Sequence, residues 1–275
     1  MSNAPKPTTA KKETSGGSSI FAGLAIVICI AIAWGIFLFV MGNPANFEGG
    51  DNANHPLEGN YLGMIYKGGI VVPFLIGMFL MVIVFSIERF FVISKAAGKG
   101  NVDAFVKKVQ SFLSSGNIDS AISECDKQKG SVAAVIKSGL LKYKEVESDT
   151  VMNTEQKCLA IQKDIEEATA LEMPMLEQNL TVVSTLVSIG TLVGLLGTVV
   201  GMIKAFAALA TAGAPDQAAL ANGISEALIN TATGIGTSTL AIISYNFFTS
   251  KIDSLTYSID EAGFSIVQTY ASTHR

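Results

Sequence analysis

The sequence predicts an all-α, polytopic membrane protein with four transmembrane helices, of which the last two extend into a cytoplasmic helical bundle. Two observations predict this fold class. The apolar residues are gathered into four long runs, and the residues between these runs follow a helical spacing. The composition agrees, because 49% of the 275 residues are hydrophobic, 15% are charged and the mean hydropathy is +0.44. These values are high for a soluble protein.

The N-terminal region predicts a tail followed by a first span. Residues 1–19 are polar and low in complexity, which is typical of a disordered tail. Residues 20–42 carry no charge and reach the roughly 20 residues that cross a hydrocarbon core. A cleaved signal peptide is the alternative, since Lys11 and Lys12 precede this run. The run is about twice as long as the apolar region of a signal peptide, and no clear cleavage site follows, so we expect a retained helix.

Three more apolar runs complete the membrane part. An external loop at 43–67 leads to the second predicted span at 68–93. The third span covers 178–210, a short external turn covers 211–216, and the fourth span covers 217–248. Each of these runs is long enough to cross a bilayer as a helix.

The segment 94–177 predicts the cytoplasmic helical domain. Its first helix carries apolar residues at helical spacing and ends near Gly116. The residues on that apolar face are Val102, Phe105, Val106, Val109 and Leu113. Shorter amphipathic helices follow, and we expect them to pack with the long helices of the third and fourth spans.

Two long helices are expected to connect the membrane to this domain. With Thr154 as its cap, one helical pattern continues from 155 to 209 into the third span, over about 80 Å. Pro174 interrupts this pattern, and we expect a kink there, near the membrane surface. The fourth span continues in the same way as a cytoplasmic C-terminal helix at 249–275.

The basic residues predict the orientation of the chain. Of the 19 lysines and arginines, 17 lie in the tail, in the large segment after the second span and in the C-terminal segment. Four spans place these segments on one side of the membrane, and basic loops favour the cytoplasmic side. Both termini are therefore expected in the cytoplasm. Lys67 and Lys204 lie at the ends of spans, where their side chains can extend outward.

Several classes of function find no support in the sequence. The net charge of −4 gives no case for nucleic acid. The acidic run at 164–172 is interpreted as a solvated helix face, with a cation site as the alternative. No nucleotide-binding loop or catalytic constellation is present, so we expect no enzyme and no cofactor. We also expect neither a disulfide nor a metal site, and expect the histidines to be solvated, because the candidate side chains are widely spaced: Cys29, Cys125, Cys158, His55 and His274.

The third span has two distinct faces. Small residues let helix backbones approach closely in lipid, so we expect a stripe of glycines to pack against a neighbouring helix and to hold subunits of an oligomer together. The stripe consists of Gly190, Gly194, Gly197 and Gly201. The other side carries hydroxyls, which either bond back to their own helix or line a hydrated surface. They belong to Thr181, Ser184, Thr185, Ser188, Thr191 and Thr198.

The fourth span contains a carboxylate, Glu226. If the helix begins just after the external turn, Glu226 is about ten residues in, roughly 15 Å deep and near the bilayer centre. A charge at that depth costs at least about 3 kcal/mol. On a regular helix Asn230, Thr233 and Thr237 lie within about 60° of Glu226, which predicts a polar, partly hydrated pathway. A hydrogen-bonded structural carboxylate is the alternative. Thr231 points about 140° away, so it shares a narrow lumen with Glu226 only if the helix bends.

These two spans carry motifs that resemble a known family. "VGLLGTVVGMIKAF" at 193–206, followed by "ISEALINTATGIGTSTLAIISYNFF" at 224–248, is similar to the two characteristic spans of the MotA/TolQ/ExbB proton-channel family, and most similar to its ExbB branch. The resemblance implies a ring subunit of a bacterial inner-membrane motor. ExbB-like proteins form pentamers around single-span ExbD-like partners, and use the proton-motive force for TonB-dependent transport across the outer membrane. It also implies that Thr198, Glu226 and Thr231 line the proton pathway.

The sequence departs from the family pattern in three ways. It lacks a proline before the first motif, it carries Lys204 at a position that is often uncharged, and the span at 20–42 is extra to the basic three-span pattern. The extra span makes the count resemble MotA, but MotA-type stators lack the glutamate of the last span. A TolQ-like role in envelope integrity is an alternative to the ExbB-like role.

Two further classes are weighed against this motor. A stand-alone secondary transporter predicts paired repeats and several buried charges, and only Glu226 is clearly a buried charge here. A purely structural scaffold does not need Glu226. Because the two polar spans offer one carboxylate and no histidine, we expect a partner helix to supply a second acid, an aspartate.

Overall fold

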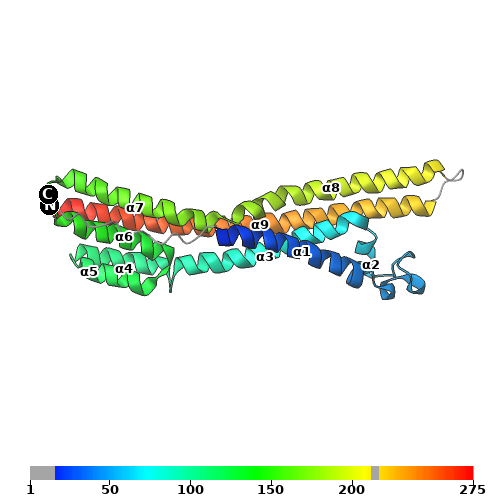
Figure 1. Cartoon of the computed structure of the whole chain (residues 1–275), viewed down its shortest axis with the longest axis horizontal. Helices are drawn as coiled ribbons and strands as arrows, with labels where there is room; N and C mark the ends of the chain where they lie inside the picture. The colour runs from blue at the N-terminus through cyan, green and yellow to red at the C-terminus, as the bar shows by residue number, and fades with distance from the viewer. Residues whose placement is uncertain (1–15, 212–216, 275) are drawn as a thin grey trace.

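The computed structural model shows an elongated bundle of α-helices (Figure 1). It describes residues 16–211 and 217–274, so that most of the predicted tail and of the predicted external turn lie outside the described residues. Within the described part no β-strand forms, and an isolated bridge joins Phe47 to Pro56. The predicted all-α fold class is confirmed.

Four helices of the described chain are long and apolar enough to cross a membrane, in agreement with the four predicted spans. They are α1 (Gly16–Gly35), α3 (Val72–Ala97), α8 (Leu180–Thr211) and α9 (Gln217–Thr273). A π-helical segment, Ile36–Met41, continues α1. Because α1 begins at Gly16, the helix includes the end of the segment 1–19 that was expected to be disordered. α9 is one helix of 57 residues, which confirms that the fourth helix continues past Lys251 without a break.

The membrane-spanning helices form two layers. α8 and α9 lie antiparallel along each other, α3 packs against both, and α1 packs on α3 (Figure 1). Their shared core is apolar, with Leu75, Val82 and Phe85 of α3 fully buried against Val183 and Leu186 of α8. The outer faces of α1, α8 and α9 leave many large apolar side chains exposed, as expected for surfaces that meet lipid or other copies.

At one end of the molecule, four shorter helices form a bundle with the C-terminal half of α9, and three of the four pack directly against it (Figure 1). They are α4 (Val102–Ser114), α5 (Ile118–Gln128), α6 (Gly130–Glu147) and α7 (Thr154–Glu177). The predicted apolar face of α4 packs into this core, with Val102 partly buried, and Gly116 ends the helix region with φ of +70°. The cap of α7 is Asn153 and not Thr154, because the Asn153 side chain accepts from the backbone N–H of Gln156.

α7 and α8 are separate helices. A kink was expected at Pro174, but the break between the helices lies after Glu177. Pro174 lies inside α7, which ends at Glu177, and α8 begins at Leu180. Arg89 of α3 explains the position of the break. Its Nη1 donates to the carbonyl oxygens of Met175 and Leu176, at 3.2 and 3.0 Å, which would otherwise accept bonds from the next helical turn.

The loop between α1 and α3 is compact. Phe47 is buried against the ring of Tyr66, which ends the short helix α2 (Tyr61–Tyr66). The Lys67 ammonium donates to the carbonyl oxygens of Asn52 and Ala53 and lies 5.5 Å from the centre of the Phe47 ring. Lys67 therefore turns back onto its own loop. A 3-10 turn, Gly69–Val71, then leads into α3.

Candidate functional site

The glycine stripe of α8 brings α9 close enough to build the site. A methyl group on Gly194 would lie 3.1 Å from Asn230 O and from Gly234 Cα, and one on Gly201 would lie 2.9 Å from Ala227 N. Gly190 faces Ser238, and Gly197 faces Asn230. All four predicted glycines thus pack against α9 of the same chain. The stripe is therefore not available for the expected contact between subunits, because α9 of the same chain covers it.

Glu226 is buried where α8, α9 and the start of α3 meet. Its Oε1 accepts a hydrogen bond from Lys204 Nζ at 2.6 Å, and the two side chains form a salt bridge. The expectation that Lys204 extends outward is therefore wrong. Its ammonium group turns to the carboxylate of the neighbouring helix, which lies within its reach. Gly69, with φ of +77°, makes room for the pair, since a Cβ at that position would overlap Glu226 Oε1.

Glu226 also lies nearer to the loop end of the spans than the sequence predicted. Its neighbour Gly69 belongs to the turn that precedes α3, and not to the middle of that span. The expected position near the bilayer centre assumed four helices of equal extent. In the structure α8 and α9 reach beyond the start of α3, so a residue well inside α9 meets only the first turn of its neighbour (Figure 1).

Asn230 fixes α9 to the same turn. Its side chain is fully buried, and Nδ2 donates to Gly68 O at 2.9 Å. Its Oδ1 is buried without a hydrogen-bond partner. A buried, unpaired acceptor of this kind is unfavourable by about 1–3 kcal/mol. One turn from Glu226, Asn230 thus places a free acceptor inside the spans.

A pocket of about 590 Å³ lies against Glu226 on the loop side. Its charged and titratable lining comes from three parts of the chain: His55, Glu58 and Lys67 of the loop, Lys204 of α8, and Glu226 of α9. Burial lowers the pKa of Lys67. The pocket gives the buried carboxylate an opening, lined in part by charged side chains, toward the loop end of the spans.

The predicted hydroxyls bond mostly to their own helices. Thr233 donates to Ile229 O, and Thr237, which is fully buried, donates to Thr233 O. Thr231 bonds to Ala227 O, and Thr198 to Leu195 O. These bonds agree with the first of the two alternatives given for such hydroxyls, in which they bond back to their own helix.

The structure does not bring all the predicted pathway residues together. Thr231 lies at the edge of the α8 contact, beside Gly194, whereas Glu226 faces Gly69 on the other side of α9. Thr231 and Thr198 are partly exposed, and neither lines the pocket at Glu226. Glu226 and Asn230 form one group, and Thr198 and Thr231 lie apart from it.

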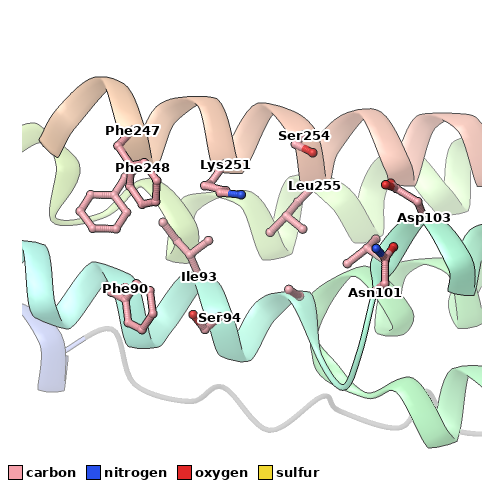
Figure 2. Close-up of a pocket in the computed structure, with 12 residues that line it drawn as sticks. Phe90, Ile93, Ser94, Asn101, Asp103, Phe247, Phe248, Lys251, Ser254 and Leu255 are labelled. Carbon is pink, nitrogen blue, oxygen red and sulfur yellow. The ribbon is translucent and has the colours of Figure 1, made fainter. Parts of the chain in front are cut away.

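A second pocket, of about 370 Å³, lies at the junction between the spans and the bundle. Figure 2 shows Phe90 and Ile93 of α3 facing Phe247, Phe248 and Lys251 of α9. It contains none of the predicted site residues, and Phe247 is roughly 30 Å from Glu226 along α9. It is therefore separate from the candidate site.

Sequence reasoning missed the contacts of four residues. Arg89 gave no signal because its partners are backbone carbonyls far away in the sequence. Gly68 and Gly69 were read only as the start of an apolar run. His274, expected to be solvated, stacks on Tyr270 with ring centres 4.3 Å apart.

Comparisons with known proteins agree with this architecture. Residues 127–261 match the MotA/TolQ/ExbB proton channel family. The chain is 29% identical over 160 residues to the Tol-Pal system protein TolQ of Pseudomonas aeruginosa, covering 58% of this chain and 69% of the relative. It is 33% identical over 94 residues to the biopolymer transport protein ExbB of Xanthomonas campestris pv. campestris, covering 34% of this chain and 37% of the relative. A putative ExbB homolog of Methanothermobacter thermautotrophicus is 23% identical over 195 residues, covering 71% and 65%.

Proposed function

We propose that this chain, a member of the MotA/TolQ/ExbB proton channel family, is an ExbB-like ring subunit of a proton-motive-force-driven motor in the bacterial inner membrane. In this role it energises TonB-dependent transport across the outer membrane. One observation carries the proposal: Glu226 is the buried carboxylate of the described chain, and it lines a pocket together with other charged and titratable side chains. Ionisable side chains inside membrane spans mark ion and proton pathways.

The proposed motor requires partners. The separation of Thr198 and Thr231 from Glu226 supports this requirement. Glu226 alone binds one proton, and no second carboxylate of the described residues is buried beside it. A single-span, ExbD-like partner is proposed to supply a membrane aspartate, and a TonB-like protein to carry the motion onward. Thr198 and Thr231 are partly exposed on the α8–α9 pair, where such a partner helix can contact them.

Several copies of the chain are proposed to surround the partner, five of them by resemblance to ExbB. Exposed apolar side chains along α8 and α9 support assembly, since they include Leu195, Val199 and Leu228, each more than half exposed. In the proposed topology the bundle and both termini face the cytoplasm, and the loop at 43–67 faces the periplasm. The pocket at Glu226 then opens on the side from which protons enter.

A TolQ-like role in envelope integrity is the second candidate. It is favoured by the match to TolQ of Pseudomonas aeruginosa, which covers 69% of that relative, whereas the ExbB match covers 37%. Both roles use the same ring and the same proton site. They differ in the protein that the motor drives.

The two roles are distinguished by deleting the gene in the native bacterium and restoring either the wild-type chain or Glu226→Gln. Ferric-siderophore uptake and sensitivity to detergents are then measured in the same cells. The proposal predicts that uptake is lost in the deletion and in Glu226→Gln, and that detergent resistance is kept. Loss of detergent resistance with normal uptake would assign the TolQ-like role. Normal results for both would contradict the motor.

A further inference from the structure

The ion pair at the candidate site is asymmetric. The Glu226 side chain is 11% exposed, whereas the Lys204 side chain is 52% exposed, although their charged atoms are 2.6 Å apart. The carboxylate is thus fixed between helices, and the ammonium reaches it from a position at the edge of the pocket. Of the two partners, Lys204 is therefore the one whose side chain is open to the pocket.

The surroundings of Glu226 are rich in cationic and weakly basic groups. Lys204 comes from α8, Lys67 and His55 come from the loop, and Glu58 is the other acid that lines the pocket. Asn230 Oδ1, one turn along α9 from Glu226, is a buried oxygen without a hydrogen-bond partner. A metal cation prefers several oxygen ligands, and here the first carboxylate oxygen is bonded to an ammonium group.

We propose that Lys204 determines the ion specificity of this site, because its ammonium group occupies the cation position at Glu226 and excludes Na⁺ while protons still reach the carboxylate. This inference rests on the proposed function of Glu226 as the proton site. When a proton binds, the carboxyl becomes neutral, and the half-exposed ammonium is solvated in the pocket. When Na⁺ binds instead, two cations meet at one carboxylate of low exposure, which is unfavourable.

The proposal is tested on the purified full-length chain with a hydrophobic carbodiimide, which modifies protonated carboxyls in membrane proteins. Modification of the peptide that contains Glu226 is measured by mass spectrometry in NaCl and in choline chloride of equal ionic strength. For the wild type we expect equal rates in the two salts. For Lys204→Met we expect Na⁺ to slow the modification severalfold, because the ion then competes with protons for the carboxylate.

Matched variants separate charge from position. Lys204→Arg keeps a cation and should behave as the wild type, and so should Lys67→Met, which alters the same pocket without removing the partner of Glu226. Protection of the wild type by Na⁺, or no protection in Lys204→Met, would overturn the proposal.

A second measurement needs no reagent. Ligands that bind only the folded protein raise its Tm. NaCl, relative to choline chloride, should raise the Tm of Lys204→Met and of Lys204→Gln and leave that of the wild type unchanged. An equal response in all three would overturn the proposal. Neither measurement depends on a partner or on transport, so failure of this inference is distinguishable from failure of the proposed motor.

Discussion

Arg89 of α3 donates from Nη1 to the carbonyl oxygen of Leu176 at 3.0 Å, and thereby ties the second span to the end of α7. The Arg89 side chain is 2% exposed and also forms a salt bridge with Glu88. This contact lies where the chain passes from the bundle into α8. It gives the connection between the two parts of the molecule a fixed geometry, because the guanidinium replaces bonds that a continuous helix would make itself.

Replacing Arg89 should weaken this connection. In Arg89→Leu the carbonyls of Met175 and Leu176 lose a buried donor, which should lower the free energy of unfolding by about 1–3 kcal/mol. Thermal unfolding followed by circular dichroism measures the loss. The matched control is Lys95→Leu, because Lys95 is exposed in the last turn of the same helix. Equal stability of the two variants would show that the Arg89 contact does not contribute.

The contact between α8 and α9 predicts a contrast between two glycines of one helix. A methyl group on Gly234 would lie 2.6 Å from Gly190 O and 2.8 Å from Gly194 Cα, whereas one on Gly236 would meet nothing within 4 Å. Gly234→Ala should therefore destabilise the single chain by about 1–3 kcal/mol through overpacking. Gly236→Ala should be neutral or stabilising by up to about 1 kcal/mol. Unfolding of both variants in detergent measures the contrast, and the reverse order would contradict the packing.

The proposed topology predicts which engineered thiols react from outside the cell. A cysteine at Asn52, in the loop, should react with an impermeant maleimide in whole cells. A cysteine at Val151 should react only after lysis, since Val151 is 91% exposed but belongs to the bundle. Reaction of Val151→Cys and protection of Asn52→Cys in intact cells would reverse the topology.

Native Cys125 is a poor reporter of topology for a physical reason. Burial raises the pKa of its thiol to about 12. At pH 8 the thiolate fraction is then roughly one in ten thousand, about 1,000-fold below that of a thiol with a pKa near 9. Its maleimide labelling should remain slow after lysis and become fast in denaturant. Because ionisation is favoured in the unfolded chain, the contribution of this thiol to stability should be lost as the pH rises from about 9 to about 12. Fast labelling of the folded, lysed sample would contradict the burial.

The sequence alone was sufficient for the spans and for the faces that pack locally. Apolar runs and helical spacing depend on neighbouring residues, so the four spans and the buried face of α4 followed from them. The glycine stripe was also recognised, but its partner was not. The partner is set by the antiparallel register of α8 and α9. Gly190 faces Ser238 and Gly194 faces Gly234, so a step of four residues along α8 corresponds to a step of four residues back along α9.

The contacts of the site itself depended on tertiary structure. The same antiparallel register carries Lys204 to Glu226, a pair that neither span shows when it is considered by itself. The place of Gly69 beneath that pair, and of Asn230 on Gly68, required the path of the loop between α2 and α3. Periodicity describes one helix at a time, and these contacts join three segments that are far apart in the sequence.

Proton flux into liposomes is the most direct test of the role of Glu226. The chain is reconstituted with the proposed single-span partner, a pH gradient is imposed, and internal pH is followed with a fluorescent dye. We predict that the wild-type complex conducts protons, that the chain alone leaks few, and that a Glu226→Gln complex of unchanged size conducts no more than empty liposomes. Wild-type flux through the Glu226→Gln complex, or robust and selective flux through the chain alone, would contradict the account.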